Sequence, residues 1–152
     1  MSVSLSASTM GKGHVVKVTA AVIERDGRFL IAQRRPDDGS LGGLWEFPGG
    51  TVEAGETPED CLRRELAEEL AIDVQVEELI NRNTHSYPHM TIELLAFRVT
   101  WLEGEMELRE HTAARWVVPD ELGLFPMPPA DGPLVHVLVD GRHGPEHKST
   151  VK

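Results

Sequence analysis

The chain has 152 residues, of which 40% are hydrophobic, and this length and composition suit one globular domain with its own core. Its formal charge of −10 at pH 7 argues against a protein that binds the backbone of DNA or RNA directly, because such binding needs clustered Lys and Arg. The single cysteine, Cys61, excludes an internal disulfide and the multi-cysteine spacings of zinc sites.

The two ends of the chain differ in composition from the segment between them. Residues 1–13 are rich in Ser and Gly, and the residues after Asp140 are polar and interrupted by Gly and Pro. We therefore predict a flexible tail over 1–13, one domain over 14–140 and a second flexible tail over 141–152. No signal peptide is recognisable, and no apolar run approaches the roughly 20 residues that cross a bilayer. We expect a cytoplasmic protein without a membrane partner.

In chain order, the first predicted elements are two strands joined by a tight turn. Residues 15–24 are rich in β-branched side chains, Arg-Asp-Gly at 25–27 interrupts them, and 28–33 resume an apolar run, which together predict a β-hairpin. A loop rich in Gly and Pro follows. Residues 44–47 then lead into Pro48, Gly49 and Gly50, where two glycines permit close approaches of the backbone that a side chain would block.

The clearest helix begins after Thr57, whose hydroxyl can cap the backbone amide of Asp60, with Pro58 at the first helical position. We predict that this helix ends near Leu70. Further strands are predicted over 72–83, 90–102 and 114–118, followed by a short helix over 132–140 that Asp131 could cap. This mixed order of elements predicts an α+β fold.

Three carboxylates share one side of the predicted helix, because Glu65, Glu68 and Glu69 stand at positions i, i+3 and i+4. One interpretation is a solvated acidic face paired with neighbouring arginines. The other follows from the helical wheel, which places Glu65 and Glu69 beside the apolar residues Cys61 and Leu62. Partly desolvated anions stay ionised only when cations neutralise them, and hard oxygen ligands suit Mg²⁺ or Mn²⁺.

The residues around this helix resemble the box of the Nudix hydrolases, G-x5-E-x7-R-E-U-x-E-E-x-G-U, in which U is aliphatic. The matching positions are Gly50, Glu56, Arg64, Glu65, Leu66, Glu68, Glu69 and Ile72. Only Ala71, which stands where the box has its last glycine, departs from the pattern. Because this position lies at the helix end, where glycine often supplies a left-handed cap, the departure concerns local geometry more than metal binding.

The resemblance to the MutT-like and CTP pyrophosphohydrolase-like branch of that family continues outside the box, in LWEFPGG, EHTAARWVVPDEL and FPMPPAD. It implies an αβα sandwich around a mixed β-sheet. It also implies a nucleoside triphosphate pyrophosphohydrolase that uses Mg²⁺ (or Mn²⁺) and acts on (d)CTP-like or oxidised purine nucleotides such as 8-oxo-dGTP.

The resemblance also assigns roles to residues of this chain. It implies a metal site made of the Gly49 carbonyl and the carboxylates of Glu65, Glu68, Glu69 and Glu110. Glu65 and Glu68 are the candidates for acid–base catalysis. Arg64 is counted with the catalytic residues because it braces a carboxylate. Gly50 and Glu56 would support the junction between loop and helix.

Three residues are candidates for substrate binding, and each has an alternative interpretation. Arg35 matches a phosphate contact, but Arg34 and Arg35 together are also typical of a solvated strand end. Phe47 matches a residue of the base pocket or belongs to the core. Asp131 stands where a related enzyme reads the base with Asn, and it could equally be a helix cap.

Two further functions remain open from the sequence. One is a non-catalytic nucleotide-sensing or base-recognition module, although such domains commonly lose the box carboxylates that this chain keeps. The other is hydrolysis of ADP-ribose or a dinucleoside polyphosphate. We expect a monomer or homodimer, and neither His85 nor His89 has a third metal-binding partner nearby in the sequence.

Overall fold

The structure, a computed structural model, describes residues 15–141, so the predicted tail over 1–13 and residues 142–152 of the predicted tail over 141–152 lie outside the described residues. Gly141, which we assigned to that tail, is instead the last residue of a helix. The strands are β1 (Val15–Arg25), β2 (Arg28–Arg34), β3 (Trp45–Glu46), β4 (Asp73–Tyr87), β5 (Met90–Glu103) and β6 (His111–Val117). The α-helices are α1 (Pro58–Leu70) and α2 (Gly132–Gly141), and three short 3-10 helices are η2 (Gly39–Leu41), η3 (Pro119–Leu124) and η4 (Pro129–Asp131). Neither α-helix has the length and apolarity needed to span a bilayer.

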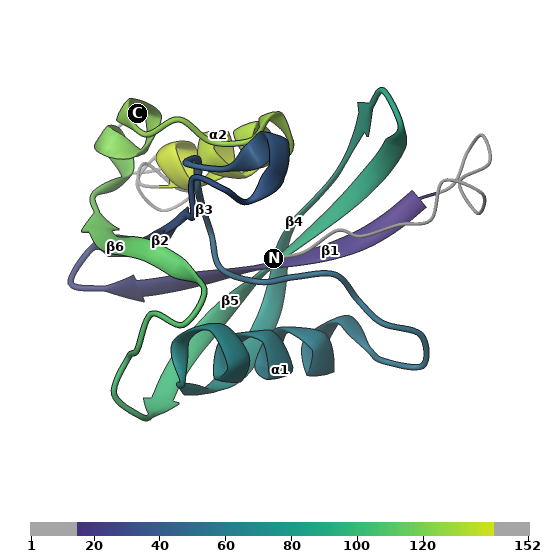
Figure 1. Ribbon diagram of the computed structural model, residues 1–152. Helices are drawn as coiled ribbons and strands as arrows, with labels where there is room; N and C mark the ends of the chain where they lie inside the picture. Colours follow the sequence, from purple (N-terminus) through teal and green to yellow (C-terminus); the bar gives the residue numbers. More distant parts are fainter. Residues whose placement is uncertain (1–14, 142–152) are drawn as a thin grey trace, which may run out of the picture.

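The six strands form one mixed sheet in the order β3-β2-β1-β5-β4, with β6 also paired to β2. Only the pairing of β1 with β5 is parallel, and the other pairs are antiparallel. The helices α1 and α2 lie on opposite faces of this sheet (Figure 1). The predicted α+β fold, with its sandwich around a mixed sheet, is confirmed.

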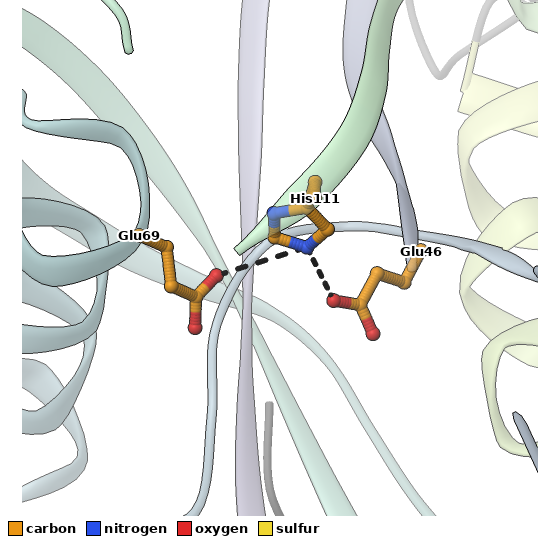
Figure 2. Close-up of side chains that lie close together, drawn as sticks. All are labelled: Glu46, Glu69 and His111. Atoms are coloured by element: carbon orange, nitrogen blue, oxygen red, sulfur yellow. Dashed lines mark hydrogen bonds and ion pairs between the residues drawn. The ribbon is translucent and has the colours of Figure 1, made fainter. Parts of the chain in front are cut away.

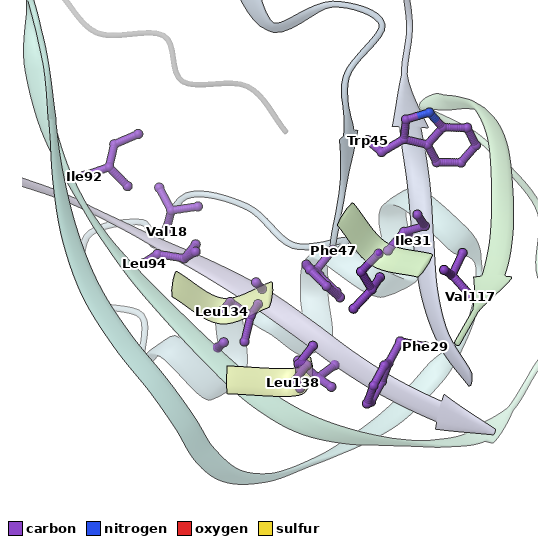
Figure 3. Packing of buried hydrophobic residues seen from close by; sticks show 14 of the residues in the cluster. Val18, Phe29, Ile31, Trp45, Phe47, Ile92, Leu94, Val117, Leu134 and Leu138 are labelled. Atoms are coloured by element: carbon purple, nitrogen blue, oxygen red, sulfur yellow. The ribbon is translucent and has the colours of Figure 1, made fainter. Parts of the chain in front are cut away.

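Alternating side chains of β1 supply the two cores, because successive residues of a strand point to opposite faces. Val18 and Val22 pack with Leu134 of α2, and Figure 3 shows part of this cluster. Ala21 and Ile23 pack with the apolar side of α1, which consists of Leu62, Leu66 and Leu70. The amphipathic pattern of α1 therefore fixes which of its side chains face the sheet.

The predicted hairpin of β1 and β2 forms, but its strands separate soon after the turn. Asp26 and Gly27 both have positive φ, 53° and 77°, as a two-residue type I′ turn requires. The two strands pair only at Glu24↔Phe29 and Arg25↔Arg28. Farther from the turn, β1 bonds to the loop after β3, which positions that glycine-rich loop against the sheet.

The helix α1 begins and ends as the sequence predicts. The Thr57 side chain accepts a hydrogen bond from the Asp60 amide, and the helix ends at Leu70. Strands β4 and β6 are longer than predicted, since β4 continues to Tyr87 and β6 begins at His111. The additional residues are mostly polar and give little indication of a strand by themselves. They are held in β4 by pairing with β5 and in β6 by pairing with β2.

Ala71, which replaces the box glycine, adopts the left-handed conformation at the end of α1, with φ 61° and ψ 30°. This conformation costs a non-glycine residue roughly 1–2 kcal/mol. We expect Ala71→Gly to raise the free energy of unfolding by about 1 kcal/mol, after the greater backbone entropy of glycine is subtracted.

Thermal unfolding of the Ala71→Gly variant tests this, with a rise of about 3 °C expected for a domain of this size. The matched control is Ala67→Gly, at an exposed position inside the same helix. It should lower the free energy of unfolding by about 1 kcal/mol. Equal destabilisation by both changes would contradict the assigned strain.

Candidate active site

The helix carboxylates pass from solvent into the protein interior along one side of α1. The side chain of Glu68 is 54% exposed, that of Glu65 is 14% exposed, and that of Glu69 is completely buried. This gradient confirms that Glu65 and Glu69 lie at the edge of the apolar side. The interpretation as a purely solvated acidic face is therefore wrong for Glu69.

Burial first, and then the neighbouring carboxylates of Glu65 and Glu46, raise the pKa of Glu69 well above its usual value. Neither oxygen of Glu69 has a hydrogen-bond partner among the described residues. A buried polar group without a partner is costly, typically by about 1–3 kcal/mol. The site therefore calls for a cation or a proton at Glu69.

The glycine-rich loop lies between β1 and α1, and its backbone contacts both of these elements. The amides of Thr19 and Ala21 donate to the carbonyls of Gly50 and Pro48, at 2.8 and 2.7 Å. A Cβ atom on Gly49 would lie 2.0 Å from the Thr19 oxygen, and one on Gly50 would lie 2.3 Å from the Glu65 carboxyl carbon. Glycine at position 49 is thus required for the loop to pack against the backbone of β1, whereas a side chain at position 50 would displace the Glu65 carboxylate.

Arg64 joins this loop to the helix. Its guanidinium donates two hydrogen bonds to Glu56, at 2.7 and 3.0 Å, and others to Glu65 at 3.1 Å and Glu68 at 3.3 Å. These bonds to Arg64 lower the pKa of Glu56 to about 2. Arg64 therefore holds three carboxylates in fixed positions, as expected for the arginine of the box.

We expect Arg64→Lys to weaken metal-dependent activity by about 10–100-fold, the usual effect of losing a group that orients metal ligands. Lysine keeps the charge but lacks the planar fork that bonds Glu56 with two nitrogens. The measurement is the Mg²⁺ concentration that gives half-maximal turnover. Arg63→Lys, on the same helix and paired with Asp60, is the matched control; an equal effect in both variants would contradict this role.

The structure also brings together three buried polar residues to which the sequence assigned no role in the site. One of them is Arg34, for which the interpretation as part of a solvated strand end is wrong, because it is buried. Arg34 donates to Glu46 at 3.0 Å, and Nε2 of His111 lies 2.8 Å from the other Glu46 oxygen and 4.0 Å from Glu69. Burial opposes ionisation of Glu46, but the hydrogen bond from His111 and the charge of Arg34 hold its pKa below the usual range. In the sequence, the indication of this buried cluster is Glu46, a charged residue inside the apolar segment 44–47.

The predicted residues on the adjoining loops lie at the surface. Glu110 is exposed just before β6, on a segment whose Arg109 amide donates to the Glu69 carbonyl at 3.0 Å. Arg35 is also exposed, and its guanidinium donates to the Arg109 carbonyl at 3.1 Å. The metal role of Glu110 and the phosphate role of Arg35 remain predictions.

Phe47 and Asp131, which are far apart in the sequence, line one small pocket together with Glu46 and Tyr87. The hydroxyl of Tyr87 accepts a hydrogen bond from the Ala130 amide at 3.2 Å, which ties η4 to β4. Asp131 ends η4, and its side chain makes no capping hydrogen bond within residues 15–141. Burial, together with the charge of Glu46, raises the pKa of Asp131 to about 8.

Comparison with known proteins identifies the family. A profile of the NUDIX domain matches residues 18–137. Over 125 residues, 82% of this chain and 92% of the relative, the chain is 40% identical to a CTP pyrophosphohydrolase of Escherichia coli. Over 130 residues, 85% of this chain and 95% of the relative, it is 36% identical to an 8-oxo-dGTP diphosphatase of Haemophilus influenzae.

Solved structures agree with these relatives. The solution structure of the E. coli ORF135 protein superposes with a TM-score of 0.76 at 40% identity, covering 85% of this chain and 91% of that one. A MutT protein of the Nudix hydrolase family from Staphylococcus aureus gives 0.68 at 33% identity, covering 83% and 96%. The resemblance carried by the box is confirmed, and the chain belongs to the NUDIX domain family as a Nudix hydrolase.

Proposed function

We propose that this protein is a nucleoside triphosphate pyrophosphohydrolase that uses Mg²⁺ or Mn²⁺ and releases a nucleoside monophosphate and pyrophosphate. Its proposed substrates are (d)CTP-like nucleotides or oxidised purine nucleotides such as 8-oxo-dGTP. The names of the similar proteins from E. coli and H. influenzae support this substrate class. The observation that carries the proposal is the buried, unpartnered carboxylate of Glu69 beside Glu65 and the glycine-rich loop.

This set of residues fits a divalent cation. The site offers carboxylate oxygens, which are the ligands that Mg²⁺ and Mn²⁺ prefer, and a partly exposed side at Glu68 through which waters and phosphates could reach it. Glu65, Glu68 and Glu69 would hold the ion, joined in the proposal by the Gly49 carbonyl and Glu110. When bound, such an ion neutralises phosphate charge and makes a water acidic enough to attack phosphorus near pH 7.

The protein's own residues would position the substrate and move the proton. Glu65 or Glu68 accepts the proton of the attacking water, and Arg64 with Glu56 keeps these carboxylates oriented. Arg35 contacts the phosphates in this proposal. Catalysis is then mainly positioning and electrostatic stabilisation, as in other phosphoryl transfers.

The pocket lined by Phe47 and Asp131 is the proposed base site. Below pH 8 a neutral Asp131 carboxyl both donates and accepts a hydrogen bond, so it could pair with an acceptor and a donor on one base edge. Cytosine presents such a pair in its ring nitrogen and exocyclic amine, and guanine presents one in O6 and the adjacent N–H. Phe47, which lines the pocket and also packs in the hydrophobic core, could contact either base.

A panel of nucleotides, assayed with Mg²⁺ and analysed for products, tests the proposal. We expect a monophosphate and pyrophosphate from at least one cytosine or oxidised guanine triphosphate. Nucleotide binding that persists without metal and without turnover would indicate a sensing module instead. Release of two nucleotides or a sugar phosphate would indicate a dinucleoside polyphosphate or ADP-ribose substrate.

The proposal places this enzyme in the cytoplasm, as a monomer or homodimer. Cys61 supports a reducing compartment, since its thiol is buried and free and lies near Thr19 and Gly50. Burial raises the pKa of Cys61 to about 11, so the thiol stays neutral and packs as a small apolar group.

A further inference from the structure

We propose that Glu46, Glu69 and His111 form a second metal site, which takes a divalent transition-metal ion such as Zn²⁺. This site is distinct from the proposed Mg²⁺ surface of α1, although it shares Glu69 with it. Only one consequence, the inhibition of nucleotide hydrolysis by Zn²⁺, rests on the proposed function. Binding of the transition metal itself requires no catalysis.

The three side chains converge from three different elements, β3, α1 and β6 (Figure 2). One ligand atom from each of them lies within 4.8 Å of the other two. Nε2 of His111 stands between the carboxylates, 2.8 Å from Glu46 and 4.0 Å from Glu69. Tetrahedral ligands of Zn²⁺ are about 3.4 Å apart, given bonds of about 2.0–2.1 Å, so small side-chain rotations suffice.

Burial supplies an independent indication that a ligand is missing. The side chains of Glu46, Glu69 and His111 are 4%, 0% and 1% exposed. Neither Glu69 oxygen has a hydrogen-bond partner within the described range 15–141. Glu69 is aimed at His111, so an ion between them would satisfy the carboxylate that the fold leaves unpartnered.

The donor set favours Zn²⁺ over Mg²⁺ at this position. Imidazole nitrogen is a common ligand of Zn²⁺, whereas Mg²⁺ prefers six oxygens and retains several waters, for which a buried site has little room. The two carboxylates match the charge of one divalent ion. Arg34 donates to Glu46 at 3.0 Å and also pairs with Asp38 at 2.8 Å, so the Asp38 carboxylate offsets the added charge of Arg34 beside the site.

The shared Glu69 makes the two metal sites compete. A Zn²⁺ ion held by Glu46 and His111 would draw Glu69 away from Glu65 and Glu68. We therefore expect Zn²⁺ to inhibit Mg²⁺-supported hydrolysis, and the inhibition to be lost when His111 cannot bind the metal. Zn²⁺ would then inhibit by withdrawing Glu69 from the proposed Mg²⁺ site.

Titration of the metal-free, full-length protein with Co²⁺ provides a readout without turnover, because tetrahedral Co²⁺ absorbs visible light far more strongly than octahedral Co²⁺. We expect a tetrahedral spectrum that Zn²⁺ abolishes at equimolar amounts and that Mg²⁺, which competes only through the shared Glu69, reduces only at a far higher concentration. His111→Gln and Glu46→Gln should each weaken Co²⁺ binding by at least about tenfold. Circular dichroism establishes that each variant is folded. If one of the two variants does not fold, the other still tests the site.

Control variants separate this site from other histidines and carboxylates. His136→Gln changes a 77% exposed imidazole on α2, and His143→Gln with His147→Gln changes two histidines outside the described residues. These variants and Glu68→Gln should retain the tetrahedral spectrum. An octahedral spectrum only, or a tetrahedral one unchanged in both His111→Gln and Glu46→Gln, would overturn the inference. If instead nucleotide turnover is absent while the spectrum behaves as expected, the proposed function fails and the metal site stands.

Discussion

Glu69→Gln is expected to lower kcat for Mg²⁺-dependent nucleotide hydrolysis by about 10²–10³-fold, because a metal ligand typically supplies several kcal/mol of charge stabilisation in the transition state. Glutamine has nearly the same volume and can fill the same buried space beside Leu66 and Leu70. The loss would therefore come from the missing negative charge. Steady-state kinetics with the best nucleotide of the panel, over a range of Mg²⁺ concentrations, measures it.

The same substitution should leave the fold intact and more stable at neutral pH without metal. The pKa of Glu69 is raised above its ordinary value of 4.5 in the folded protein. The contribution of Glu69 to stability is therefore fully present below about pH 4.5 and is lost as the pH rises towards the folded pKa. Glutamine does not titrate, so the advantage of the variant in urea unfolding should grow as the pH rises above 4.5.

Glu59→Gln is the matched control, because Glu59 is an exposed carboxylate on the same helix. It should retain full activity and show no such dependence on pH. Undiminished turnover of Glu69→Gln with unchanged dependence on Mg²⁺ would contradict the assignment of Glu69 as a metal ligand.

Asp131→Ala is expected to lower kcat/KM by about 10²-fold, because two buried hydrogen bonds to the base are lost together. The pH dependence gives the sharper test. Since the pKa of Asp131 is raised to about 8, the wild-type KM should rise above pH 8 as the carboxyl loses its donor proton. Asparagine offers a donor and an acceptor at every pH, so Asp131→Asn should remove this alkaline rise.

Stability should follow the same titration. The pKa of Asp131 is raised from 3.8 to about 8 on folding, so the associated stability is present below pH 3.8 and lost between pH 3.8 and 8. Asp131→Asn should thus be more stable than the wild type at pH 9. Asp140→Asn, at an exposed position of α2, is the control. An alkaline rise that persists in Asp131→Asn would refute the role of Asp131 in base binding.

Local signals in the sequence were sufficient for much of the fold and for the helix carboxylates. The cap at Thr57 and the apolar spacing of Leu62, Leu66 and Leu70 fixed the bounds of α1 and its orientation. The same spacing places Glu65 and Glu69 beside the buried side of the helix. These properties depend on residues within a few turns of one another, and helical periodicity describes them well.

The neighbouring arginines show where local signals stop being sufficient. Arg34 and Arg35 have the same chemistry, yet Arg34 is buried against Glu46 and Arg35 is exposed. Which of the two enters the protein depends on the register of β2 with β6, where a bulge lies between Gln33 and Arg34. A shift of one residue would exchange their faces.

The sequence by itself therefore determined the family, the ends of α1, the cluster of helix carboxylates and the need for glycine beside them. Only the tertiary structure decided that Glu46 and His111 meet Glu69, and that Phe47 and Asp131 share a pocket. The physical reason is that burial of a charge, and with it the shift of its pKa, depends on strands and loops that are distant in the chain. Such contacts form only when the strands pair into the sheet, so the spacing of residues along the sequence does not predict them.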